Sequence, residues 1–183
     1  MNINLQQAKS LLKNNNKVIA YIKQDGVPVY TDVHEFVPFN DATFKTICID
    51  LLNDNNVQLT YSDNISFEEL QSINNNDLLD NVILSENWED VTSLKDLKFF
   101  TGFTAIKNLP DNNEVFKNIV EIDMRNISTI GSYAFLNHTG ISLYNTYNIT
   151  TINQRAFDST IILNDTLPFN SLTTLGQYAF YNA

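Results

Sequence analysis

The chain repeats nearly the same six residues three times within its last 54 positions. The copies are Ile130–Phe135, Ile152–Phe157 and Leu175–Phe180, and their phenylalanines are separated by 22 and then 23 residues. A fixed period of about 20–29 residues with constant apolar positions is typical of a solenoid, in which each repeat buries its apolar side chains against its neighbours. The repeat therefore predicts an architecture, and it names no ligand.

The residue types within the copies predict which side chains form the core of the repeats. Isoleucine, leucine and phenylalanine are expected to point inward and to stack on their equivalents in adjacent coils. Alanine suits places where chains cross closely, and glycine allows backbone conformations that other residues resist. Asn153 replaces the glycine in the middle copy, and asparagine is common at positive φ. The predicted repeat core comprises Ile130, Gly131, Ala134, Phe135, Ile152, Ala156, Phe157, Leu175, Gly176, Ala179 and Phe180.

Short β-like runs lie between the copies, at residues 120–124, 141–144 and 161–164. Each repeat can therefore be read as a strand, a turn, the six-residue segment and a return. A degenerate first copy is expected to begin near residue 97 and to end at Val115 and Phe116. The sequence predicts about three to four coils with parallel strands, open at the C-terminal side.

The first half of the chain does not repeat. Its patterns predict a helix at residues 2–16, strands at 17–24 and 27–39 around Asp25-Gly26, and a helix from about residue 41 to 52. A strand is expected at 57–61, a capping box at Ser66–Glu69 that starts a short helix, and further helices near 77–84 and 91–98. The predicted class is α+β, with a docking module at residues 1–75, a helical connector or cap at 76–98 and a β-solenoid at 99–183.

The repeats resemble the BspA-like subfamily of leucine-rich repeats, whose units read Leu-x-x-Ile-x-Leu-Pro…Leu-Thr-x-Ile-Gly-x-x-Ala-Phe. Residues 127–135 and 167–180 follow this pattern closely. The resemblance covers about residues 97–183 and implies a leucine-rich-repeat architecture, while it is uninformative about activity. The bacterial surface members of the family are secreted, whereas no secretory signal is visible in this sequence.

Composition argues against several classes of function. The net charge is −10 and no basic stripe appears, so we expect no nucleic-acid partner. No apolar run is long enough for a membrane span. With one cysteine, Cys48, two histidines and five glycines, no thiol nucleophile, zinc site, serine hydrolase or phosphate loop is predicted. We therefore expect no enzyme activity, no metal and no cofactor.

Two functions are predicted for the solenoid as a recognition surface. The first is a structural or attachment component of a bacteriophage virion, such as a tail or head fibre. The N-terminal module would anchor it, and the repeats would bind other virion proteins or a host-surface protein or glycan. The missing signal, the 27 asparagines and the non-repeating first half motivate this hypothesis, and a fibre would be a homo-oligomer, typically a trimer. The alternative is a bacterial or protist cell-surface adhesin or interaction protein. The expected location is the virion, or the bacterial cell surface for the alternative.

The candidate binding residues follow from the strand positions. If the strands line a concave face, alternate side chains point outward, and these are Glu121, Asp123, Ser142, Tyr144 and Asn164. Trp88 is expected to fill the joint between the N-terminal module and the solenoid, and stacking on a sugar is the other interpretation.

Overall fold

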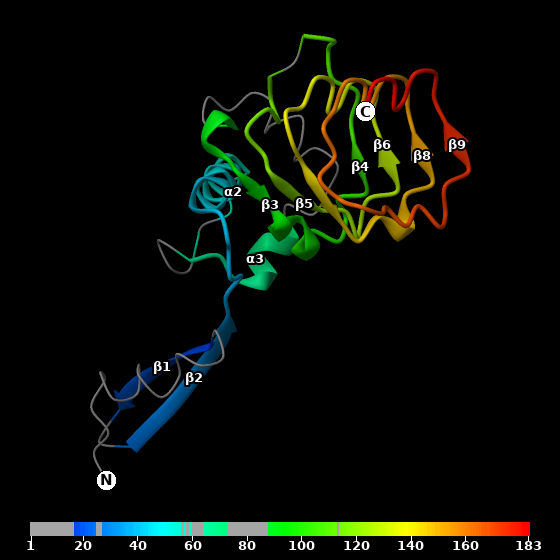
Figure 1. The fold of residues 1–183 in the computed structure, drawn as a ribbon. Helices are drawn as coiled ribbons and strands as arrows, with labels where there is room; N and C mark the ends of the chain where they lie inside the picture. The colour runs from blue at the N-terminus through cyan, green and yellow to red at the C-terminus, as the bar shows by residue number, and fades with distance from the viewer. Residues whose placement is uncertain are drawn as a thin grey trace.

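The computed structural model describes residues 17–24, 27–55, 57, 59, 64–72, 88–112 and 114–183. The helices expected at 2–16 and near 77–84, the turn at Asp25-Gly26 and most of the strand expected at 57–61 lie outside these ranges. Figure 1 shows a hairpin at one end of the molecule, two helices beside it, and the repeats stacked at the other end. The described α-helices are α2 (Ala42–Asp54) and α3 (Phe67–Ser72), with 3-10 helices at Trp88–Asp90, Lys95–Phe99 and Thr146–Asn148.

The hairpin consists of β1 (Lys17–Gln24) and β2 (Val27–Glu35), which pair antiparallel with a bulge between Ile19 and Tyr21. The antiparallel pair that the sequence predicts around residues 25 and 26 is confirmed. β2 ends at Glu35, three residues before Pro38 and earlier than the predicted end at residue 39.

The helices start where the sequence predicts. Asp41 is the N-cap of α2, and its carboxylate accepts a hydrogen bond of 2.8 Å from the Phe44 backbone N–H. At α3, the Ser66 N–H donates to Glu69 Oε2 (2.7 Å) and the Glu69 N–H donates to Ser66 Oγ (3.2 Å). The capping box is therefore confirmed, with each residue satisfying a backbone donor of the other.

The repeats form two parallel sheets. One contains β3 (Ser93–Leu94), β5 (Glu121–Asp123) and β7 (Ser142–Tyr144), and the other contains β4 (Ala105–Ile106), β6 (Thr129–Ile130), β8 (Thr151–Ile152) and β9 (Thr174–Leu175). The prediction of an α+β fold with parallel strands is confirmed. The helix expected at 91–98 is wrong, because Ser93 and Leu94 pair with β5 as a strand and a 3-10 helix follows. Pairing with a neighbouring coil overrides the local helical pattern there.

A ladder of stacked phenylalanine rings runs through the repeats. Successive ring centroids lie 5.6 Å apart from Phe116 to Phe135, 5.1 Å from Phe135 to Phe157 and 5.2 Å from Phe157 to Phe180. Phe116 therefore occupies the position of the motif phenylalanine, which confirms a degenerate copy that ends there.

The predicted repeat core is buried in the inner coils. Ile130, Ile152, Phe135 and Phe157 are at most 1% exposed, and the three motif alanines are at most 3% exposed. On the last coil, Leu175 is 58% exposed and Phe180 is half-buried. The motif side chains of the last coil are more exposed because a described coil packs on one side of it only.

The expected role of the motif glycines is wrong. Neither Gly131 nor Gly176 adopts positive φ, and Asn153 does not either. The left-handed residues are instead Tyr133, Arg155 and Tyr178, at the position before the alanine. What requires glycine is space, because a Cβ on Gly131 would lie 2.2 Å from the carbonyl carbon and oxygen of Lys107.

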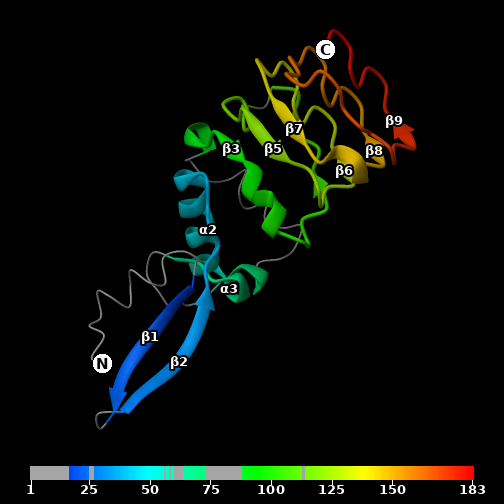
Figure 2. The same ribbon diagram turned by 60° about the horizontal axis from the view of Figure 1, so that its bottom comes forward.

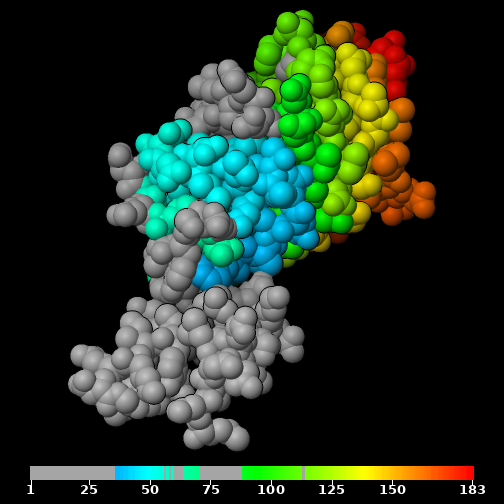
Figure 3. Space-filling view, turned by 90° about the vertical axis from the view of Figure 1, so that its left-hand side faces the viewer, coloured from blue at the N-terminus to red at the C-terminus, as the bar shows by residue number. Residues whose placement is uncertain are grey.

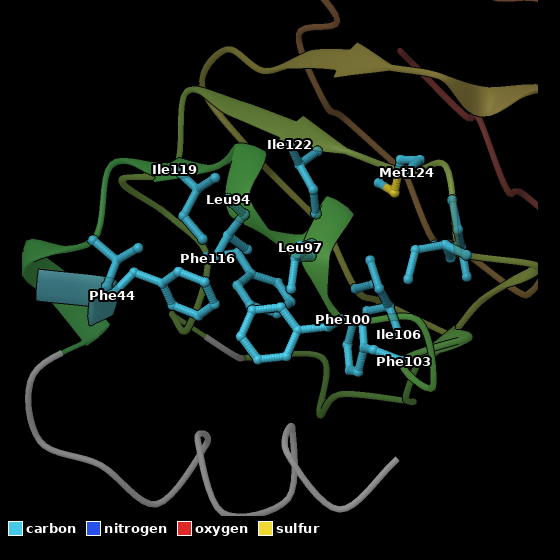
Figure 4. Packing of buried hydrophobic residues seen from close by; sticks show 14 of the residues in the cluster. Phe44, Leu94, Leu97, Phe100, Phe103, Ile106, Phe116, Ile119, Ile122 and Met124 are labelled. Carbon is cyan, nitrogen blue, oxygen red and sulfur yellow. The ribbon is translucent and has the colours of Figure 1, made fainter. Parts of the chain in front are cut away.

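The joint between the helices and the repeats is aromatic. The Trp88 ring lies 6.3 Å from Phe44 of α2 and 5.7 Å from Phe116 of the repeats, measured between centroids. Figure 3 shows the helical region lying directly against the first coils, and Figure 4 shows Phe44 and Phe116 in one continuous core. Trp88 is 6% exposed. It therefore fills the joint as predicted, and it is not a sugar-stacking residue.

Candidate binding surface

Figure 2 shows the sheet formed by β3, β5 and β7. We call the side of this sheet that carries Ser93, Glu121, Asp123, Ser142 and Tyr144 the strand face. The parallel register aligns Ser93 with Glu121 and Ser142, and it aligns Asp123 with Tyr144. Side chains from three successive coils are thereby brought side by side, although they are up to 51 residues apart in sequence.

Lys95 links the first two coils of the strand face to the third. Its ammonium lies 2.5 Å from Glu121 Oε2 and 4.8 Å from the centroid of the Tyr144 ring. The Ser93 hydroxyl donates to the other Glu121 oxygen at 2.8 Å. Partial burial tends to raise the pKa of Glu121, but the hydrogen bonds from Lys95 and Ser93 outweigh it and hold that pKa below its ordinary value. The carboxylate is therefore already satisfied within the protein.

Asp123 forms a second internally paired charge. The residue is 5% exposed, and Arg125 donates to its carboxylate through Nε (3.0 Å) and Nη2 (2.7 Å). Asn145 Nδ2 adds a hydrogen bond of 3.0 Å. Burial tends to raise the pKa of Asp123, but these hydrogen bonds hold it below its ordinary value. Asp123 supports the surface and presents little of itself to solvent.

Asn164 closes the edge of the sheet. Its Oδ1 accepts a 2.7 Å hydrogen bond from the Leu143 N–H, and its Nδ2 donates to the Leu143 carbonyl at 3.1 Å. The side-chain amide thus takes the place of a strand backbone beside β7. The run at 161–164, expected as a strand, contributes one isolated bridge between Ile141 and Ile162.

Large aromatic and aliphatic side chains are exposed on β7 and in the segments that follow it. Tyr144 is 40% exposed and Tyr147 is 43% exposed. Ile161 and Leu163 are 57% and 58% exposed, in the run that follows β7 by one repeat. Of the five predicted residues, Tyr144 offers the most surface, Ser142 is half-buried, and the other three have their polar groups bonded internally.

Sequence reasoning missed Lys95, Arg125, Tyr147 and Leu163 as parts of this region. Leu163 could have been found, because it lies 21 residues after Ser142 and keeps the repeat register. Lys95 could not, because the segment that contains it was predicted to be a helix.

Two hollows lie elsewhere on the repeats. One of about 280 Å³ lies between the turns at residues 111–118 and 134–139, with both His138 nitrogens hydrogen-bonded inside the protein. The other, of about 400 Å³, is an open groove over Gly131. Within the described ranges, no three His, Cys, Asp or Glu side chains gather as metal ligands, and no helix there is long and apolar enough to cross a membrane.

A family model described as BspA type leucine-rich repeat region (6 copies) matches residues 63–183. The chain belongs to the BspA-type leucine-rich-repeat family. The match extends the resemblance upstream from residue 97 and takes in α3, Trp88 and β3. No curated protein and no solved structure matches the chain. BspA-type repeats are protein-interaction or surface-binding repeats, and the family is generally non-enzymatic.

Proposed function

We propose that this protein is a non-enzymatic binding protein whose BspA-type repeats hold a protein partner on the strand face. The observation that carries the proposal is the exposure of Tyr144 on a sheet whose charges are already paired. Large aromatic side chains in a rigid setting are the residues that most often dominate protein–protein binding energy.

The paired charges favour a partner that brings apolar and neutral polar groups to the contact. Lys95 is held by Glu121, and Arg125 is held by Asp123, so neither cation needs a counter-charge from the partner. The strand face is also preorganised, because Lys95 packs over the Tyr144 ring. A preorganised surface loses less conformational entropy when a partner binds.

The biological setting is a further part of the proposal. Membership of the BspA-type family favours an adhesin or interaction protein displayed at a cell surface. The attachment component of a bacteriophage virion is the second setting. Residues 1–75, most of which precede the family match at 63–183, would serve as an anchor, with 76–98 as the connector and 99–183 as the binding repeats. In that setting the chain would form a homo-oligomer, typically a trimer.

A photo-crosslinking phenylalanine analogue placed at Tyr144 tests the proposal. Its matched control carries the same analogue at Gln154, which is exposed on a turn of the repeats. We expect a protein to be captured from the position of Tyr144 and not from that of Gln154, with mass spectrometry identifying it. Virion proteins among the products would favour the phage setting, and surface proteins of a cell would favour the adhesin. Equal capture from both positions would contradict a binding role for the strand face.

A further inference from the structure

The polar contacts across the joint between the helices and the repeats depend on two carboxylates. Asp41 Oδ2 accepts hydrogen bonds from the Thr92 N–H (2.9 Å), the Thr92 hydroxyl (3.1 Å) and the Ser93 N–H (3.1 Å). Asp96 accepts from Asn40 through the backbone N–H (2.6 Å) and through Nδ2 (2.5 Å), and more distantly from the Asp41 N–H (3.4 Å). These six hydrogen bonds, between residues 40–41 and residues 92–96, all end on one of the two carboxylates.

The coils of the repeats are held together differently. Backbone N–H groups donate to the carbonyls of adjacent coils, as from Phe135 to Ala156 and from Phe157 to Ala179, each at 2.8 Å. Backbone hydrogen bonds and stacked phenylalanine rings do not titrate between neutral and acid pH. Within the repeats, Glu121, Asp123 and His138 also titrate, but each of them adds to backbone hydrogen bonds between the coils. Protons therefore act more strongly on the joint than on the contacts between coils.

The two aspartates lie among neutral hydrogen-bond donors. Of the charged groups around them, Lys95 pairs with Glu121 on β5, and the Cys48 thiol of α2 is buried beside Asp96. A protonated Asp41 would lose charge-assisted hydrogen bonds to Thr92, Ser93 and the N-terminus of α2. Buried donors left without acceptors are costly, so protonation favours separation of the two surfaces.

We infer that the joint between residues 36–72 and the repeats is an acid-sensitive clasp, which opens at a pH where the repeats remain folded. When the joint opens in acid, the N-terminal part of the chain would be free to move relative to the strand face. Burial tends to raise the pKa of Asp41, but its hydrogen bonds from Phe44, Thr92 and Ser93 hold it below the ordinary value of 3.8. The clasp is thus closed above that pH and opens as the pH falls through the lower value in the folded protein.

Trp88 reports on the clasp directly, because it is the single tryptophan of the chain and lies buried in the joint. In a titration from about pH 7 to about pH 2, we expect its emission to shift to the red before the far-ultraviolet circular dichroism of the protein changes. Coincident transitions of the two signals would overturn the inference. So would an emission that stays unchanged until the circular dichroism collapses.

Variants separate the clasp from general acid sensitivity. We expect Asp41→Asn and Asp96→Asn to shift the Trp88 emission to the red near neutral pH, or to raise the pH at which it shifts. The matched control is Asp158→Asn, which alters a buried carboxylate within the repeats that contacts Ser159 and Arg155. It should leave the Trp88 titration as in the wild type. An effect of Asp158→Asn equal to that of the clasp variants would count against the inference. If a clasp variant does not fold, the comparison of the two signals in the wild type still decides.

Discussion

At the scale of single residues, the closest approach between coils decides where glycine is required. Gly131 lies against the Lys107 carbonyl and Gly176 lies against the backbone of Asn153 and Gln154, at distances that no real Cβ tolerates. The positive φ values in the same motif fall on tyrosine and arginine. The motif glycine is therefore fixed by packing between backbones, and the left-handed position two residues later accepts larger side chains.

We predict that Gly131→Ala destabilises the protein by about 2–3 kcal/mol, because the added methyl group must push the Lys107 backbone away. Gly140→Ala is the matched control. A Cβ there would meet the Leu163 side chain at 3.7 Å, which is ordinary van der Waals contact. Urea unfolding of both variants measures the difference. Equal stability of the two variants would show that the coils can part at Gly131 without cost.

Asparagine side chains act as clamps between coils, beyond the turn-forming role that composition predicts. Asn126 Nδ2 donates to the carbonyls of Leu97, Lys98 and Phe100, and Asn148 Nδ2 donates to the Arg125 carbonyl at 2.6 Å. An amide carries both donors and an acceptor, so it can satisfy backbone groups that strands of two or three residues leave unpaired. The many asparagines of the chain thus fit its short strands.

His138 gives the repeats a pH dependence in the range of imidazole titration. Its Nε2 lies 2.8 Å from the Phe116 carbonyl and its Nδ1 accepts from the Gly140 N–H, so the bonded form is neutral with the proton on Nε2. Burial lowers the pKa of His138 below its ordinary value of 6.5. The stabilising contribution is therefore present above that pH, and it is lost as the pH falls toward the lower value of the folded state.

We predict that the free energy of unfolding of the wild type decreases between about pH 7 and about pH 5, and that His138→Gln removes most of this decrease. Glutamine does not titrate, so a lower stability of the variant at neutral pH does not affect the comparison of slopes. Urea unfolding at several pH values measures both proteins. An unchanged slope in His138→Gln would assign the pH dependence to another group.

At the scale of elements, the sequence predicts the strands of the repeats and the N-terminal caps of the helices. The period predicted the parallel strands and the first phenylalanine of the ladder, because both depend on residues that recur at fixed spacing. The caps at Asp41 and Ser66 were also predictable, since capping is a local interaction. β3 was not predictable, because it lies in a segment with a helical pattern and its partner β5 is 28 residues further along the chain. The same limit applies to the strand face, where Lys95 and Tyr144 meet through register and not through a motif.

The phenylalanine ladder predicts a gradient of mutational cost along the repeats. Phe157 is fully buried between Phe135 and Phe180, whereas Phe180 is half-buried on the last coil. We expect Phe157→Ala to lower the free energy of unfolding by about 3–5 kcal/mol, and Phe180→Ala by less than half as much. Chemical denaturation compares the two variants. A similar cost for both would mean that the ladder is not the main source of cohesion between coils.

At the scale of the whole molecule, the strand face of this acidic protein carries balanced charges. The net charge is −10, yet the cations Lys95 and Arg125 each neutralise a carboxylate on the strand face. Long-range attraction would steer a basic partner to the molecule as a whole, while the contact itself would rest on Tyr144 and the exposed side chains around it. Affinity and association rate should therefore respond differently to salt.

We predict that the dissociation constant for a partner captured at Tyr144 changes by less than about threefold between about 0.05 and 0.5 M salt, because paired charges require no counter-charge from the partner. Tyr144→Ala should weaken binding by about 30-fold, which corresponds to about 2 kcal/mol for a central aromatic residue. Tyr181→Ala is the matched control, since Tyr181 is also exposed but lies on the last coil. Calorimetry at both salt concentrations measures these effects. A steep salt dependence with an unchanged affinity in Tyr144→Ala would instead indicate binding through the net charge of the molecule, away from the strand face.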